Sequence, residues 1–158
     1  MTDARTLLRH TLATLSYRGG KAIRNAPASF ANYGGTDASR TAAEILAHIG
    51  DLMDWGLSMA EGQQKWRDST PLLWDQECER CFAALKKFDD YLASDKPLLA
   101  PAEKLFQGPV ADALTHVGQI AMLRRMAGAP IKGENYYVAD ITVGTVGPDQ
   151  TPPRQEFD

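Results

Sequence analysis

Asp112-Ala-Leu-Thr-His116-Val-Gly-Gln119 is the stretch from which the fold can be worked out. Asp112, His116 and Gln119 follow i, i+4, i+7 spacing, so a helix places them on one face. Ala113 and Ile120 lie close to the same face, which is typical of a helix side that packs into a core. Because buried polar groups need partners, the sequence predicts a metal site or a buried hydrogen-bond network on this face.

The composition is that of an ordinary soluble domain. The chain has 158 residues, of which 44% are apolar and 23% charged, enough for one domain with a real core. A net charge of -3 provides no basic field for nucleic acid, and no apolar run is long enough to cross a bilayer. The first residues lack the apolar core of a signal peptide. We therefore expect a cytoplasmic protein that binds neither nucleic acid nor membrane.

Local signals place two helices before residue 62. The first is predicted to start near residue 2 or 3 and to end before Pro27, with Gly19-Gly20 marking a kink or a close helix contact. Thr41 and Glu44 have the spacing of a capping box, which starts a second helix that Gly62 ends.

Two further helices are expected after a polar connection. Thr70 as cap and Pro71 as first helical residue predict a third helix that runs to about Ser94. Gly108-Pro109 is expected to start the fourth helix and Gly128 to end it. Arg124 and its neighbour suit the negative end of that helix dipole.

Four amphipathic helices of this length indicate an all-α protein, a four-helix bundle over residues 1–130. The connections are long enough to allow a crossover instead of simple up-down neighbours. Residues 131–158 are rich in Pro, Gly and acids and form an irregular C-terminal tail expected to pack on the bundle, where it could cover one end of the site. Alternation around residues 137–143 is a weak strand signal.

A second histidine lies on an apolar helix face. His48 is surrounded by Ile45, Leu52, Trp55 and Met59 on the second helix. Facing helices of a bundle can bring His48, Asp112 and His116 within coordination distance of one ion. Two histidines and one carboxylate leave coordination positions open, as in catalytic zinc and non-haem iron sites. The alternative is a buried, metal-free network of the same three residues.

Other polar residues have weaker claims. Gln119 is a candidate contact to a metal ligand or to a substrate. Asp51 and Glu44 are the only bases that we can offer outside the ligand set; Glu44 already serves the helix cap, and Asp51 is expected to be solvated or to support a ligand. Cys78 and Cys81 fall in a regular apolar stripe, so we interpret them as reduced core residues.

Two segments resemble a known family. Residues 43–49, Ala-Glu-Ile-Leu-Ala-His-Ile, followed by Trp55, resemble the second helix of the DinB superfamily of DinB/YfiT-like metalloenzymes, and residues 108–119 resemble its last bundle helix. The resemblance covers roughly residues 3–128. It implies a divalent metal held by three histidines, one on the second helix and an H-x-x-x-H pair on the last. His48 and His116 match, whereas Asp112 replaces the first histidine of the pair. A carboxylate can also ligate zinc, nickel, iron or manganese.

The resemblance implies a metal-dependent enzyme. Family members are described as metal-dependent hydrolases, and some relatives as transferases or isomerases that use a metal to activate a small thiol. We therefore expect metal-activated water or a low-molecular-weight thiol to act on a small-molecule substrate, in a homodimer. The alternative function is a non-catalytic helical bundle that binds a small ligand or a partner. Metal analysis of the purified protein separates the two.

Overall fold

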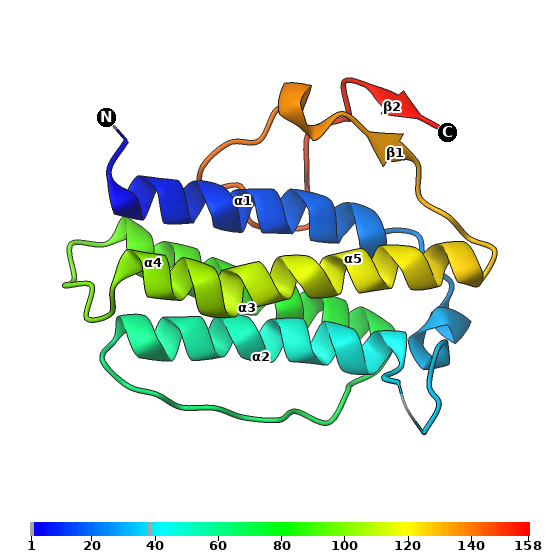
Figure 1. The fold of residues 1–158 in the computed structure, drawn as a ribbon, viewed down its shortest axis with the longest axis horizontal. Coiled ribbons are helices and arrows are strands. Elements are labelled where there is room, and N and C mark those ends of the chain that lie inside the picture. Colours follow the sequence, from blue (N-terminus) through cyan, green and yellow to red (C-terminus); the bar gives the residue numbers. More distant parts are fainter. Residues whose placement is uncertain (1, 38) are drawn as a thin grey trace.

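Four long helices pack side by side in the computed structural model, which describes residues 2–37 and 39–158 (Figure 1). They are α1 Ala4–Ile23, α2 Ala42–Ala60, α3 Trp74–Ala93 and α5 Ala111–Met126. Helices α1 and α5 run in one direction and α2 and α3 in the other, so α2 and α3 are parallel neighbours. The segment 61–73 returns the chain along the length of α2 and is called the strap below. The predicted helical bundle is confirmed, with the long crossover that the connections allowed.

The limits of α2 agree with the prediction. The Thr41 hydroxyl accepts the N–H of Glu44 at 3.2 Å, and the Glu44 carboxylate accepts the N–H of Thr41 at 2.7 Å. At the other end Gly62 has a φ of 79°, a left-handed conformation in which glycine avoids steric strain. Both ends of this helix are therefore set by local chemistry.

The glycine pair in α1 lies at a close helix contact. The helix continues through both residues. A Cβ on Gly19 would lie 3.4 Å from Val117 of α5, and one on Gly20 would lie 3.6 Å from Phe82 of α3. Side chains of both neighbouring helices thus lie within van der Waals reach of this pair, as the contact alternative predicted.

The predicted start of α3 is wrong by three residues. Thr70 and Pro71 belong to the strap, and the helix begins at Trp74 with no side-chain cap from Leu73. The Glu77 carboxylate instead accepts the N–H of Leu72 at 2.9 Å. A side chain within the helix thus provides the hydrogen-bond acceptor for a backbone N–H just before the helix. Contacts of the strap with α2 and α3 override the local Thr-Pro signal.

The predicted start of the last helix is also wrong. Helical structure begins earlier, with α4 Ala102–Leu105, and passes through a π-helical turn, Phe106–Val110, into α5. Proline lacks an N–H, and in a regular α-helix its ring clashes with the carbonyl four residues earlier. The wider π turn takes Pro109 inside a continuous helix. The predicted end is confirmed, since Gly128 follows the helix with a φ of 77°.

The tail packs on α1, on the side of the bundle away from α2 (Figure 1). Its strands β1 Gly133–Glu134 and β2 Glu156–Phe157 form one short antiparallel pair. The strand signal around residues 137–143 is wrong, because Tyr136–Val138 forms a 3-10 turn. Glu134 is the anchor: its buried carboxylate accepts from the Tyr17 hydroxyl at 2.5 Å and from Lys21 at 2.6 Å.

The core lies between the four helices. Its largest fully buried side chains include Phe30, Phe88, Leu12, Leu15, Leu46 and Met53. No helix in the described part of the chain is long and apolar enough to cross a membrane.

Candidate metal centre

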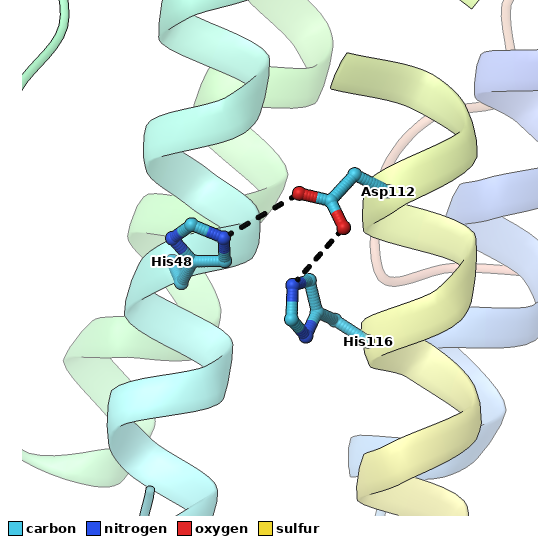
Figure 2. A group of neighbouring side chains, drawn as sticks. All are labelled: His48, Asp112 and His116. Atoms are coloured by element: carbon cyan, nitrogen blue, oxygen red, sulfur yellow. Dashed lines mark ion pairs between the residues drawn. The ribbon is translucent and has the colours of Figure 1, made fainter. Parts of the chain in front are cut away.

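Helices α2 and α5 bring the three predicted ligands together (Figure 2). One ligand atom from each of His48, Asp112 and His116 lies within 4.8 Å of the others. The Asp112 carboxylate faces both imidazoles, with Oδ2 3.6 Å from His48 Nε2 and Oδ1 3.3 Å from His116 Nε2, and the two rings lie edge to face at a centroid distance of 4.6 Å. Donor atoms from two helices therefore converge on one point.

The centre lies at the rim of the bundle and not in its core. The buried side of α5 is formed by Ala113, Val117, Ile120 and Arg124, one residue further round the helix than the polar face. The imidazoles of His48 and His116 are 15% and 13% exposed, whereas the Asp112 side chain is 48% exposed. The expectation of a fully buried polar face is therefore wrong, and the carboxylate side of the centre faces solvent.

Gln119 orients His116. The amide oxygen of Gln119 lies 2.8 Å from His116 Nδ1, and an amide oxygen only accepts, so Nδ1 carries the proton. In the neutral form of His116, the lone pair of Nε2 then faces Asp112. Ligating histidines ordinarily donate their second N–H in this way. Two electron-pair donors 3.3 Å apart are stabilised when a cation lies beside both, so the arrangement fits a metal ion.

The electrostatics keep His48 neutral near neutral pH. Burial lowers the pKa of His48, and the nearby Arg40 cation and His116 lower it further, against the opposing effect of Asp112. An imidazole must be neutral to coordinate a metal. His48 is therefore ready to bind without first losing a proton.

The strap places the aromatic ring of Trp66 beside the centre. The Trp66 ring makes an edge-to-face contact with His48 at a centroid distance of 5.6 Å and with Trp55 at 5.7 Å. Trp55, on the apolar face of α2, is half-buried. Trp66 was not anticipated, since it lies in a polar connection; an isolated tryptophan between charged residues was the available signal.

A buried ion-pair cluster fixes the helix turn that carries His48. Arg80 donates to Asp51 at 3.0 Å, to Glu77 at 2.6 Å and to the carbonyl of Ala47 at 2.6 Å. Arg80 was not singled out from the sequence. The available signal was Glu77, an acid on the buried side of the helix, because a buried carboxylate needs a cation nearby. Because Ala47 immediately precedes His48, the guanidinium ties α3 to the backbone beside the ligand.

Neither candidate base is free. Asp51 is 3% exposed and accepts from the backbone and hydroxyl of Ser69 as well as from Arg80, so the expectation that it is solvated or supports a ligand is wrong. Burial alone would raise the pKa of Asp51, but the hydrogen bonds from Ser69 and Arg80 outweigh it and lower the pKa. Glu44 is engaged in the capping box. Both carboxylates have structural roles.

Two hollows flank the centre. One, of about 390 Å³, is lined by Arg40, His48 and the strap residue Ser69; the other, of about 420 Å³, is lined by Arg40, His116 and Gln119. Arg40 borders both hollows and is exposed. Each is in the size range of small-molecule sites.

The cysteines are not part of the centre. Cys78 is half-buried and Cys81 buried, and both are free thiols, as predicted. Burial raises the pKa of each thiol to about 12. They stay protonated at neutral pH, and neither thiol belongs to the candidate metal cluster found in the described residues.

Comparison of the chain with protein-family models, with curated proteins and with solved structures finds no match. What the centre can do is therefore inferred from its own donor atoms. Two imidazoles and one half-exposed carboxylate form a donor set of the kind that can hold a divalent ion with coordination positions left open.

Proposed function

We propose that the chain is a metal-dependent enzyme of the DinB-like class that holds one divalent ion at His48, Asp112 and His116. The supporting observation is the convergence of three donor atoms within 4.8 Å. Zinc, nickel, iron and manganese all suit two imidazoles and a carboxylate. The resemblance of residues 43–49 and 108–119 to the DinB superfamily supports the class, and Asp112 is the departure from its pattern.

The chain contributes orientation and charge, and an aromatic ring beside one ligand. Gln119 would direct the lone pair of His116 toward a bound ion, and Asp112 would offset one unit of the ion's positive charge. Trp66 covers one side of His48. A divalent ion supplies Lewis acidity that generates a nucleophile from water or from a small thiol at neutral pH. The reaction class is therefore hydrolysis or thiol-dependent transfer on a small molecule.

The substrate reaches the centre from the side of Asp112. This side chain is 48% exposed, and the hollows beside it are open to the same rim. Among the described residues, Arg40 makes no hydrogen bond or ion pair, so its cation at the border of both hollows is free to attract a negatively charged group of the substrate.

Metal content is the decisive test. Protein purified without chelator and offered zinc, nickel, manganese and iron in turn should bind one ion per chain, measured by mass spectrometry of the metals. His116→Ala should remove most of it, whereas His10→Ala, an exposed histidine of α1, should change nothing. Asp112→Asn should weaken binding by removing the charge, and Asp112→His, which creates H-x-x-x-H, should retain or strengthen it.

Absence of binding by a folded wild-type protein would overturn the enzyme proposal in favour of the non-catalytic bundle. If metal binds, ester and amide panels with and without small thiols identify the reaction.

We also propose a cytoplasmic homodimer. Light scattering should then give twice the chain mass of 17.3 kDa.

A further inference from the structure

A third hollow lies under the tail, at the C-terminal ends of α1 and α5. Its volume is about 320 Å³, which suits a small ligand. The charged side chains that line it are four cations, Lys21, Arg24, Arg124 and Lys132, and two carboxylates, Glu134 and Glu156. Four positive charges less two negative charges leave a formal +2 in a chain whose net charge is -3.

Both carboxylates are already engaged. Lys21 Nζ bridges Glu134 at 2.6 Å and Glu156 at 2.7 Å. The Tyr17 hydroxyl also donates to Glu134. This group is locked together between α1 and the two strands of the tail. Lys21 and the two carboxylates together carry a formal -1, so the other three cations bring the hollow to its net +2.

Arg124 is the unusual member of the lining. It lies in the last turn of α5, where its charge suits the helix dipole as expected, but it is only 6% exposed. The guanidinium donates to the carbonyls of Ala129 at 2.8 Å, Ala22 at 3.0 Å and Arg24 at 2.9 Å. No carboxylate of the described residues pairs with it.

A buried charge without a counter-ion is unfavourable, and arginine does not escape by losing its proton. Burial lowers the pKa of Arg124 with no carboxylate to oppose it. The carbonyls hold the guanidinium rigidly in the wall of the hollow. An anion bound there would provide the missing charge without any rearrangement of the chain.

We propose that this hollow binds a small anion that carries a phosphate or carboxylate group. Guanidinium groups match the geometry of both groups. Arg24 and Lys132 are exposed at the hollow and add attraction at its mouth. The hollow shares no lining residue with either hollow beside the metal centre, so it is a separate site.

Titration of the full-length protein tests the site. Inorganic phosphate and succinate are titrated separately by calorimetry, with thermal unfolding at ionic strength matched by sodium chloride. At least one of the two anions should bind saturably and raise Tm, because a ligand of the folded state stabilises it. The anion that gives the stronger response, phosphate or succinate, identifies whether the site prefers a phosphate or a carboxylate group.

Variants locate the binding. Arg24→Gln with Lys132→Gln should lower the affinity at least tenfold, because both exposed cations are removed while the buried guanidinium remains. Lys87→Gln with Lys104→Gln makes the same charge change on exposed parts of α3 and α4, and should keep the affinity within twofold. Arg124 itself is left intact because it holds three carbonyls.

The variant His116→Ala separates this site from the metal centre and should bind the anion as wild type does. The proposal is overturned by a response no larger than that of chloride, by wild-type affinity in the Arg24/Lys132 variant, by an equal loss in the Lys87/Lys104 control, or by loss of binding in His116→Ala. Metal binding is measured independently, so failure here leaves that proposal untouched.

Discussion

Arg80→Met should be the most destabilising single change in the neighbourhood of the metal centre. The substitution keeps a long side chain but removes the guanidinium that bridges α2 and α3. Asp51, which is 3% exposed, and Glu77, which is 0% exposed, then lose the one ion-pair partner that they have among the described residues. Uncompensated buried charge is the cause of the predicted loss.

Removing one partner from a buried ion pair destabilises a protein by about 3–5 kcal/mol. Here two carboxylates are affected, but each keeps other donors: Ser69 bonds to Asp51, and the N–H of Leu72 bonds to Glu77. We therefore expect the loss to stay within about 3–5 kcal/mol and not to double. Since domains of this size are stable by about 5–15 kcal/mol, the variant should fold but be marginal.

Urea unfolding followed by circular dichroism measures the effect. With a slope of about 2 kcal/mol per molar urea, the midpoint should fall by roughly 2 M. Arg67→Met is the matched control, because Arg67 pairs with Asp54 at 3.5 Å and is 68% exposed, so its loss should amount to under about 1 kcal/mol. Equal midpoints for the two variants would refute the role of the buried cluster.

Three further predictions concern the centre and its surroundings. Gln119→Leu removes the acceptor for His116 Nδ1 and should weaken metal binding by about 10–100-fold, while Gln119→Glu keeps an oxygen acceptor and should retain it; equal affinity of both by competition titration would contradict the orienting role. The pKa of Asp51 is lower in the folded protein than in the unfolded chain. The ionised carboxylate of Asp51 therefore stabilises the fold fully at pH values above its unfolded pKa, and this stabilisation is lost as the pH falls through its folded pKa. In Asp51→Asn the free energy of unfolding should therefore decrease less steeply than in wild type as the pH is lowered, and an unchanged pH dependence would count against this assignment. Changing Cys78 and Cys81 together to Ala should leave metal content unchanged and destabilise by about 1–2 kcal/mol, whereas loss of stoichiometric metal would give the thiols a role in the centre.

Prediction from the sequence succeeded where the determining contacts are local. The capping box of α2 joins residues three apart, and its glycine stop is adjacent to the helix. It failed at the start of α3, because Ser69 bonds to Asp51 across 18 residues and holds the strap extended. The Thr70-Pro71 signal is sound locally, but it competes with a tertiary contact that no local pattern contains.

The candidate ligands were accessible to prediction for the same reason. Asp112 and His116 are one helical turn apart, and His48 stands out on an apolar stripe. The exposure of the centre was not predictable, because Arg124 occupies a place in the buried stripe of α5 where an apolar residue is expected. Trp66 was not predicted to lie at the centre, because its position depends on the path of the strap. That path is set by the tertiary contacts of the strap with α2 and α3.

The parallel arrangement of α2 and α3 also sets an order of events during synthesis. Asp51 emerges from the ribosome 29 residues before Arg80, its partner across the pair. At about 5–20 residues per second, this delay is about 1.5–6 s. Throughout it, the donors that can reach Asp51 are the N–H and the hydroxyl of Ser69 in the strap. The helix turn that carries His48 gains its contacts with Arg80 only after that part of α3 has been synthesised.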